Sequence, residues 1–347
     1  MDKVLLGMSG GVDSSVAAVL LKNQGYEVIG ATMKLCCEND EKVAIEDAKN
    51  ICEQLGIEHH VFDFSKEFKK YVIDDFISSY ESAKTPNPCI ECNKYLKFNY
   101  FYNKAQELGC KYIATGHYAK IEYSTEYNKY VLKKSDVEKK DQTYFLYNIS
   151  SDILENILFP LAKYSDKDEI RKIAEQNNLK IHKKPDSQEI CFIPDNDYSK
   201  FLEKNLKESQ KQGNIVLTTG EILGKHNGFV NYTIGQRKGL GIAYKEPLYV
   251  IYLNKEKNEV IVGTEKDLYK DELYATNLNW IAIDGIEGKL TATAKIRYRA
   301  KESKCEIEVI DKNTIKVKFE KPQRAITPGQ SVVFYDGDIV LGGGKIA

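Results

Sequence analysis

Long hydrophobic runs are missing from this sequence. The apolar-leaning stretch before Ser9 covers only residues 4–8. A signal peptide needs a longer apolar region, and a membrane-spanning helix needs about 20 such residues. We therefore expect a cytoplasmic protein with no membrane partner.

An excess of charge of one sign is also missing. Lys and Arg number 50 against 51 Asp and Glu, a formal net charge of −1, so bulk charge does not mark a nucleic-acid binder. Any RNA or DNA surface must be a local patch. Proline and glycine are modest at 8 and 23 residues, which excludes a collagenous or disordered chain. The 347 residues are enough for two or three domains.

Cysteine is too sparse for a disulfide-held secreted domain. Eight cysteines are spread unevenly over the chain, so we expect core residues, nucleophiles or metal ligands. Most have no distinctive neighbours and are expected to be inert core residues. This group comprises Cys36, Cys37, Cys52, Cys110 and Cys305.

The first part of the chain alternates strand and helix patterns. Strands are expected at 4–8, 26–33, 60–64 and 112–117, and helices at 12–24, 41–55, 67–82 and 93–108. A hairpin is expected at 121–133, and further helices at 166–176 and 198–206. This alternation predicts a doubly wound, mainly parallel sheet that binds ligands at the carboxyl ends of its strands.

The pattern of apolar and polar residues changes from Asn214 onward. Short alternating runs are separated by Gly, Asn, Asp and Pro, a pattern typical of antiparallel β structure in a barrel or sandwich. The fold class expected is therefore α/β plus β. We place boundaries near 205 and 265, which gives an N-terminal α/β domain (1–205), a central domain (206–265) and a C-terminal antiparallel β-barrel (266–347).

A phosphate-binding loop is indicated between the first strand and the first helix. Residues 9–14 read Ser-Gly-Gly-Val-Asp-Ser, where backbone N–H groups and the helix dipole would hold an anion. The Lys-Ser/Thr ending of a Walker A loop and the Rossmann spacing of glycines are both missing. Such a loop suits the pyrophosphate that leaves when ATP gives up AMP, and Asp13 could hold Mg²⁺. The stretch resembles the signature of the PP-loop ATP pyrophosphatase superfamily.

Six further segments narrow the substrate. In chain order they are Thr85–Lys94, Thr115–Ala119, Lys140–Leu146, Asp186–Ile193, Gly235–Leu240 and Thr327–Gln330. In this order they resemble the tRNA-specific 2-thiouridylases over nearly the whole chain. The resemblance implies an enzyme that uses ATP to replace the position-2 oxygen of a wobble uridine in tRNA with sulfur. It also implies a PP-loop domain, a small central tRNA-binding domain and a C-terminal β-barrel.

The resemblance also implies site residues. Cys191 would carry the incoming sulfur as a persulfide, and Cys92 would form a disulfide with it as sulfur leaves. The implied ATP contacts are Gly7, Met8, Ser9, Gly10, Gly11, Val12, Asp13, Ser14, Met33 and Gly116. The implied contacts to the tRNA anticodon arm are Asn87, Pro88, Cys89, His117, Lys140, Asp141, Gln142, Arg297, Tyr298 and Gln330.

One position departs from the family pattern. Cys89 stands where the family commonly has Asp, and with Cys92 it forms a Cys-x-x-Cys pair. With Cys191, three thiolates could ligate three irons of a [4Fe–4S] cluster whose fourth iron holds sulfide. Persulfide chemistry without metal and a structural zinc site are the alternatives, although zinc normally takes a fourth protein ligand. The sulfur donor would be a cysteine desulfurase, a relay protein or inorganic sulfide.

Two basic features suggest the RNA surface. Lys295, Arg297, Arg299 and Lys301 recur at period two, so a strand there would place four cations on one face as a phosphate ladder. Residues 235–239 form a basic loop of the kind that follows a nucleic-acid backbone. Two rival functions remain: an adenylating thiolase with another acceptor, and a non-catalytic RNA-binding protein with a Cys-x-x-Cys metal site.

Overall fold

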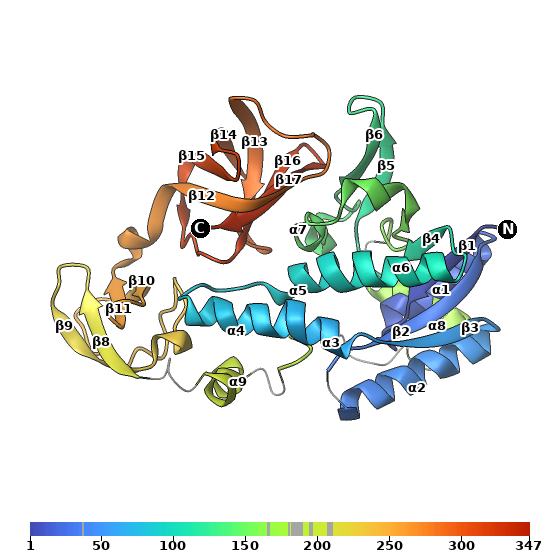
Figure 1. The fold of residues 1–347 in the computed structure, drawn as a ribbon, viewed down its shortest axis with the longest axis horizontal. Coiled ribbons are helices and arrows are strands. Elements are labelled where there is room, and N and C mark those ends of the chain that lie inside the picture. Colours follow the sequence, from blue (N-terminus) through green and yellow to red (C-terminus); the bar gives the residue numbers. More distant parts are fainter. Residues whose placement is uncertain (37, 165–166, 180, 182–189, 194–196, 207–210) are drawn as a thin grey trace.

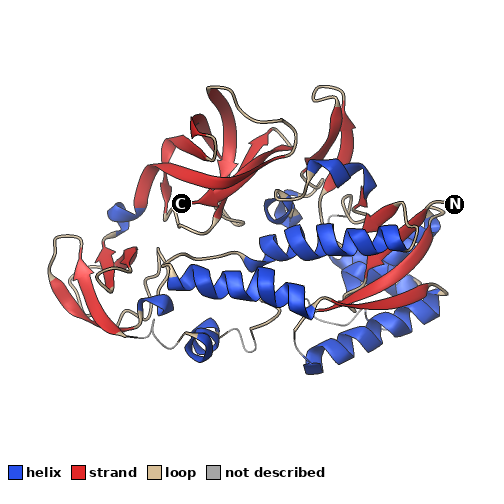
Figure 2. Ribbon diagram, in the orientation of Figure 1, coloured by secondary structure: helices blue, strands red, loops and turns tan. Residues whose placement is uncertain are grey.

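The computed structural model describes residues 1–36, 38–164, 167–179, 181, 190–193, 197–206 and 211–347. A parallel sheet with its helices lies at one end of the molecule, and a small group of strands lies at the other (Figure 1). A β-barrel stands between them, over two long helical runs (Figure 2).

A five-stranded parallel sheet, in the order β3-β2-β1-β4-β7, forms the first part of the chain. Its strands are β1 (Lys3–Gly7), β2 (Glu27–Lys34), β3 (Glu58–Asp63), β4 (Tyr112–Ala114) and β7 (Ile157–Leu158). Val4, Leu5 and Leu6 of the central strand are fully buried, and Leu5 enters a different hydrophobic cluster from its two neighbours. This alternation means that both faces of the sheet are covered. The four predicted strands are confirmed. The fifth, β7, was not predicted, because its two residues are too few to show an alternating apolar pattern.

Helices cover each face of this sheet. On the face of Val4 and Leu6 lie α1 (Val12–Asn23), α2 (Glu38–Leu55) and α8 (Lys167–Gln176). On the face of Leu5 lie two continuous helical runs, 65–81 and 88–107, which Figure 1 shows side by side. The first run comprises α3 (Ser65–Phe68), η1 (Lys69–Ile73) and α4 (Asp74–Glu81), and the second α5 (Pro88–Glu91), η2 (Cys92–Tyr100) and α6 (Phe101–Glu107).

Both runs contain a π-helical segment, η1 and η2. In a π-helix each backbone N–H bonds the carbonyl five residues back, and such segments are rare and frequently lie at functional sites. The second run also begins five residues before the predicted residue 93, because Pro88 occupies the first helical turn, where its missing N–H costs nothing.

The remaining helices are short. They are η3 (Glu138–Lys140), α7 (Thr143–Leu146), η4 (Ser151–Asn156), α9 (Tyr198–Asn205), η7 (Phe229–Asn231) and η8 (Glu265–Leu268). Within the described part of the chain, no helix combines the length and the apolar character that crossing a bilayer requires.

A four-stranded sheet in the order β10-β11-β8-β9 forms the central part. Its strands are β8 (Gln212–Leu217), β9 (Ile222–Asn227), β10 (Tyr249–Asn254) and β11 (Glu259–Gly263). The expectation of purely antiparallel pairing after Asn214 is wrong here, because β8 and β11 pair in parallel. The connection 228–248 between the two hairpins is long enough for the crossover that a parallel pair needs.

The C-terminal strands form a closed antiparallel barrel in the order β12-β15-β14-β13-β16-β17, and β12 pairs with β17 to close it. They are β12 (Tyr269–Trp280), β13 (Lys289–Lys295), β14 (Ser303–Asp311), β15 (Thr314–Arg324), β16 (Ser331–Asp336) and β17 (Ile339–Ile346). The predicted hairpin is present as β5 (Lys120–Ser124) and β6 (Lys129–Lys133), and β6 joins the barrel sheet where Lys133 pairs with Ile339. The predicted fold class is confirmed, whereas the boundaries near 205 and 265 stay predictions.

Three of the cysteines expected in the core are buried, namely Cys52, Cys110 and Cys305. Cys36 is exposed, so its expected core position is wrong. It follows β2 in a loop, where its backbone N–H donates to Glu41 Oε1 at 2.6 Å. Cys37 lies outside the described residues.

Candidate active site

The loop 9–14 is a tight turn between β1 and α1. Gly10 has φ +66°, and a Cβ there would lie 2.6 Å from the carbonyl oxygen of Ala44, so this position requires glycine. The Ser14 hydroxyl accepts from the Ser9 N–H at 3.2 Å and donates to the Gly11 carbonyl at 3.1 Å. The loop is therefore held in shape at the N-terminus of a 12-residue helix, where backbone N–H groups favour an anion.

Asp13, in the first turn of α1, is held by two side chains from other elements. The Tyr118 hydroxyl donates to Asp13 Oδ1 at 3.0 Å, and Lys167 Nζ lies 3.4 Å from Oδ2. Sequence reasoning missed both partners. Tyr118 stands inside the segment Thr115–Ala119 and could have been found there, whereas Lys167 is 154 positions away from Asp13 and carries no motif.

The other predicted ATP contacts lie at the carboxyl ends of three neighbouring strands. Gly7 ends β1, Met33 is near the end of β2, and Gly116 follows β4. The strand order reverses between β1 and β4, and a crevice at such a reversal is where open α/β sheets bind ligands. A Cβ on Gly116 would lie 3.2 Å from the Ser14 nitrogen, so this loop packs tightly on the first turn of α1. Met8 is 2% exposed and its side chain lies in the core.

The second helical run carries the Cys-x-x-Cys pair at its start. Cys89 is exposed and Cys92 is 8% exposed, packed into the hydrophobic cluster on the Leu5 face. Three residues apart on a helix, they share a face. The Asn93 side chain donates to the Phe145 carbonyl at 2.9 Å and so fixes the run against α7.

A positive charge lies near both cysteines. Desolvation raises the pKa of Cys89 and of Cys92, and the charge of Lys97 opposes that rise in both. Lys97 is five residues after Cys92 within η2, where π-helical bonding links residues five apart. At 3.6 residues per turn, Lys97 would lie on a different side of the helix. Sequence reasoning missed Lys97 because the winding of this segment leaves no pattern in the apolar residues.

His117 is half-buried beside the same helix. Its Nδ1 lies 2.7 Å from Thr115 Oγ1, and its ring packs 6.0 Å from the rings of Phe98 and Phe159. Burial, and then the charge of Lys97, lower the pKa of His117 well below its ordinary value. The imidazole is therefore neutral near pH 7. The predicted contact of His117 with RNA stays a prediction.

Cys191 is exposed, next to a residue that is anchored in the core. Phe192 is 4% exposed, and its ring lies 5.7 Å from Phe68 and 5.3 Å from Phe76 of the run 65–81. Phe192 and Cys92 belong to one hydrophobic cluster. Residues 186–189 of the same motif lie outside the described residues.

The three candidate thiolates do not form a ready metal site. Across the described ranges, which include Cys89, Cys92 and Cys191, no group of three His, Cys, Asp or Glu side chains is placed to hold a metal ion. The [4Fe–4S] cluster and the structural zinc ion therefore stay predictions.

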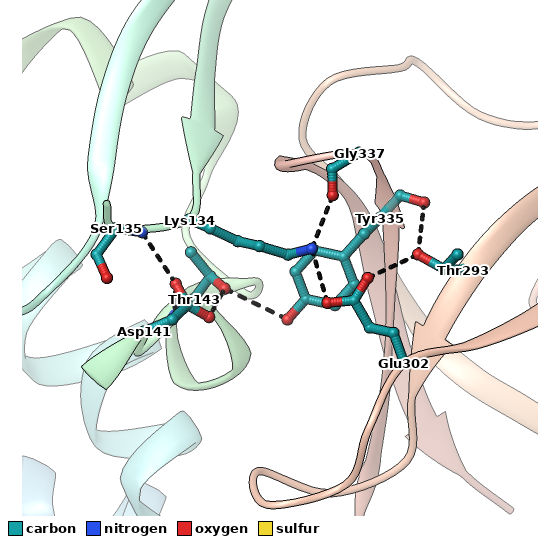
Figure 3. A network of polar contacts seen from close by, with 8 residues as sticks. All are labelled: Lys134, Ser135, Asp141, Thr143, Thr293, Glu302, Tyr335 and Gly337. Carbon is teal, nitrogen blue, oxygen red and sulfur yellow. Dashed lines mark hydrogen bonds and ion pairs between the residues drawn. The ribbon is translucent and has the colours of Figure 1, made fainter. Parts of the chain in front are cut away.

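Asp141, a predicted tRNA contact, is buried in a network that reaches the barrel (Figure 3). Its carboxylate accepts from the Ser135 N–H at 3.2 Å and from the Thr143 hydroxyl at 2.6 Å. Thr143 Oγ1 in turn lies 3.3 Å from the Tyr335 hydroxyl of β16. Desolvation raises the pKa of Asp141. In this structure the side chain joins two parts of the molecule, and its contact with tRNA stays a prediction.

The neighbours of Asp141 in the chain contact Tyr118, which holds Asp13 of the loop 9–14. Gln142 Oε1 accepts from the Tyr118 N–H at 2.9 Å, and Lys140 Nζ lies 4.9 Å from the centre of the Tyr118 ring. Tyr118 holds Asp13, so this segment is linked to the anion loop through one side chain. The tRNA contacts expected of Lys140 and Gln142 stay predictions.

The expected ladder of four cations is wrong. β13 ends at Lys295, and residues 296–300 form bends and a turn. Lys295 is 9% exposed and lies 5.8 Å from the centre of the Tyr335 ring. Arg297 donates through Nη2 to the Arg324 carbonyl at 2.6 Å.

An aromatic contact accompanies this turn. Tyr298 packs on Phe145, with 4.4 Å between the ring centres. Tyr298 is half-buried in this contact. Arg299 and Lys301 are exposed. The tRNA contacts expected of Arg297 and Tyr298 stay predictions.

The predicted basic loop is a turn held by its own hydrogen bonds. Gln236 Oε1 accepts from the Thr233 N–H at 3.0 Å, and Gln236 Nε2 donates to the Lys238 carbonyl at 3.0 Å. Arg237 and Lys238 are exposed, so both charges face solvent. The binding of a nucleic-acid backbone by this loop stays a prediction.

Comparison with known proteins decides the family. Three family profiles match the chain: a tRNA methyl transferase HUP domain over 2–195, a tRNA methyl transferase PRC-barrel domain over 199–264 and an aminomethyltransferase β-barrel domain over 270–346. The tRNA-specific 2-thiouridylase MnmA of Clostridioides difficile is 52% identical over 99% of this chain and 98% of that protein. The chain belongs to the tRNA-specific 2-thiouridylase family.

A second 2-thiouridylase, MnmA 2 of Caldanaerobacter subterraneus, is 51% identical over 99% of this chain and 98% of its own length. Among solved structures, the U34-tRNA thiolase NcsA of Methanococcus maripaludis with its [4Fe-4S] cluster is 24% identical over 60% of this chain and 67% of its own, at a TM-score of 0.38. That similarity is too low to bear on a cluster in the present chain.

Proposed function

We propose that this protein is an ATP-dependent tRNA-uridine 2-sulfurtransferase. It adenylates the position-2 oxygen of the wobble uridine and replaces that oxygen with sulfur, giving 2-thiouridine, AMP and pyrophosphate. The observation that carries the proposal is the 52% identity to a 2-thiouridylase over nearly the whole chain. The structure agrees with it: the loop 9–14 is held in shape beside the point where the strand order reverses, and Cys92 lies in the hydrophobic cluster on one face of the sheet.

The activation step belongs to the loop 9–14. Its backbone N–H groups bind the pyrophosphate of ATP, and the Asp13 carboxylate, whose two oxygens contact Tyr118 and Lys167, would hold a Mg²⁺ ion. Such an ion would neutralise phosphate charge. Attack of the uridine position-2 oxygen on the α-phosphorus releases pyrophosphate and turns a poor leaving group into AMP.

The transfer step belongs to Cys92 and Cys191. A persulfide on Cys191 attacks carbon 2 of the activated base through its outer sulfur, and AMP leaves with the oxygen. The Cys92 thiolate then attacks the Cys191 sulfur, so that a Cys92–Cys191 disulfide forms and the outer sulfur stays on the base. A reductant must reopen the disulfide before the next turnover. Burial raises the pKa of Cys92, and the charge of Lys97 partly offsets this cost of forming the thiolate.

The base must leave its stack to reach these groups. We propose that the enzyme grips the anticodon arm of tRNA by its backbone and flips the wobble uridine into the site. Arg237 and Lys238 are exposed and suited to phosphates, and Asn87, Pro88 and Cys89 precede Cys92 where the base would enter. The donor of the persulfide sulfur is a cysteine desulfurase or a relay protein, whereas inorganic sulfide would serve only the cluster alternative. The reaction takes place in the cytoplasm.

Mass analysis of nucleosides tests the proposal. Purified protein is incubated with an unmodified tRNA transcript, ATP, Mg²⁺ and a persulfide donor, and AMP and 2-thiouridine are measured together. We expect both products in equal amounts. In Asp13→Asn both should vanish while tRNA affinity is unchanged, because Asp13 serves activation and lies away from the basic loop.

The two rivals give different results. AMP without 2-thiouridine would indicate an adenylating thiolase with another acceptor. Tight tRNA binding with neither product would indicate a non-catalytic RNA-binding protein. Full 2-thiouridine formation by Asp13→Asn would remove the role of the loop in activation.

A further inference from the structure

A partly buried ion pair links the last strand of the barrel to the residue before Cys92. Lys345 Nζ on β17 lies 2.9 Å from Glu91 Oε1 and 3.3 Å from Asp75 Oδ1. Glu91 is 6% exposed, so with Lys345 in place its carboxylate is held by protein and not by water. Burial alone would lower the pKa of Lys345, but the charges of Glu91 and Asp75 outweigh it and raise that pKa. Lys345 is therefore a charged link between barrel and helix.

A second contact holds the other end of the same segment. Gln330 Nε2 donates to the Thr85 carbonyl at 2.9 Å and to the Pro86 carbonyl at 3.3 Å, and the Thr85 N–H donates to the Pro328 carbonyl at 2.8 Å. Gly329 has φ +90°, and a Cβ there would lie 2.9 Å from both backbone N and O of Thr85. The barrel loop 327–330 thus contacts the chain just ahead of Asn87.

These two contacts bracket residues 85–91. The second helical run begins within residues 85–91, at Pro88, and Cys92 directly follows Glu91, the last residue of this segment. An open cavity of about 640 Å³ adjoins the ion pair and is lined by Asp75, Glu91 and Lys345. Without the Lys345 charge, water from the cavity would reach Glu91 and the start of the run would be free to shift.

We propose that Lys345 is a positioning residue for sulfur transfer, which acts through Glu91 to fix Cys92 relative to the Cys191 sulfur. Lys345 itself touches no reacting atom. After AMP leaves, the base is joined to Cys191 through the outer sulfur, and attack of Cys92 on the Cys191 sulfur releases 2-thiouridine. The docked barrel favours this release by keeping Cys92 in place. The inference rests on the proposed function.

The yield of 2-thiouridine per AMP measures this directly. In Lys345→Met, which keeps the length of the side chain and removes its charge, we expect AMP formation in a single turnover and tRNA affinity near those of the wild type. The yield per AMP should fall roughly 10- to 100-fold, the scale that a misplacement of about 1 Å produces. Lys345→Arg keeps the ion pair and should restore the yield.

A matched control removes an ion pair that is not next to a cysteine. Lys129 Nζ lies 2.6 Å from Asp284 Oδ1, and this pair also joins a segment of the first half of the chain to the barrel region, with Asp284 95% exposed. Lys129→Met should leave the yield per AMP unchanged. A fall equal to that of Lys345→Met would mean that loosening any such pair has the same effect, and it would overturn the proposal.

Hydrogen exchange separates this inference from the proposed function. Peptides covering residues 84–95 should exchange faster in Lys345→Met than in the wild type, and at the wild-type rate in Lys129→Met. Wild-type exchange there in Lys345→Met overturns the positioning role even if the wild type makes no 2-thiouridine. Faster exchange with an unchanged yield per AMP also overturns it.

A double variant covers loss of folding in Lys345→Met. Glu91→Gln with Lys345→Met leaves no unpaired charge at position 91, so it should fold and show the same reduced yield. A wild-type yield in the double variant would overturn the proposal.

Discussion

At the scale of single residues, the cysteines differ by what surrounds them. Burial alone raises the pKa of Cys52 and of Cys305 to about 12, which leaves both thiols protonated and inert. Cys92 is buried too, but the charge of Lys97 opposes the rise in its pKa. The inert role of Cys52 was predictable from its helical face. The influence of Lys97 was not, because it depends on the winding of η2.

The cysteines also carry the first prediction. Cys92→Ser and Cys191→Ser should make AMP from ATP and tRNA but no 2-thiouridine, since each lacks one sulfur of the proposed disulfide. Cys89→Ser should keep most of its activity, because that disulfide does not use its thiol. The measurement is AMP and 2-thiouridine with a persulfide donor, in protein assayed for iron.

The cluster alternative gives the opposite pattern. Protein prepared without oxygen would be brown, and each of the three Cys→Ser variants would lose iron and activity together. Full activity in iron-free wild-type protein is the result expected here.

At the scale of elements, apolar periodicity predicted where helices lie but not how they are wound. The patterns at 67–82 and 93–108 match the runs 65–81 and 88–107, yet each run includes a π-helical segment. Charge periodicity was less reliable. Lys295 to Lys301 alternate as in a strand, but β13 ends at Lys295, and Tyr298 beyond it packs on Phe145, which lies far earlier in the chain. Such a distant partner leaves no local signal.

The basic loop 235–239 carries a prediction at this scale. Arg237→Gln with Lys238→Gln should weaken binding to all substrate tRNAs alike, because we propose that these side chains bind phosphates. The slope of log affinity against log salt should become shallower by about 0.7 to 0.9 for each phosphate that the variant no longer neutralises. Binding is measured by titration at several salt concentrations.

The control for this experiment lies in the same sheet. Lys255→Gln with Lys257→Gln removes the same charge from the exposed turn between β10 and β11 and should leave the slope at its wild-type value. Equal slopes in both double variants would contradict a specific role for the basic loop.

At the scale of the whole molecule, the change in hydrophobic pattern along the sequence predicted a parallel α/β region followed by β structure. The closed barrel and the parallel sheet agree with that prediction. Contacts between these parts were not predictable. The pair of Lys345 with Glu91 and the bonds of Gln330 to Thr85 join residues about 250 positions apart, and neither end is unusual for its own element.

Buried histidine predicts how overall stability depends on pH. His226 in β9 is 1% exposed; its Nδ1 accepts from the Gly228 N–H at 3.1 Å, and its Nε2 lies 3.1 Å from the Asn258 carbonyl oxygen. Burial lowers its pKa from the ordinary 6.5, and the Asn258 bond only partly opposes this. The unfolded chain binds a proton near 6.5 that the folded chain excludes, so stability present above that pH is lost as pH falls toward the lowered folded pKa.

Urea unfolding of the wild type and of His226→Gln tests this. Between about pH 7.5 and about pH 5.5, the wild type should lose about 1 kcal/mol more unfolding free energy than the variant, because glutamine takes up no proton. Equal losses would show that His226 protonates as readily in the folded state as in the unfolded one.

The pairing of β6 with β17 has a consequence for biosynthesis. Lys133 leaves the ribosome roughly 200 residues before its partner Ile339, an interval of about 10 to 40 s at 5–20 residues per second. During that time the outer edge of the hairpin is unpaired and could recruit strands from other nascent chains. Lys129 and Lys133 stand along this edge, where charge discourages such pairing. The hairpin is thus synthesised well before β17, the barrel strand with which it pairs.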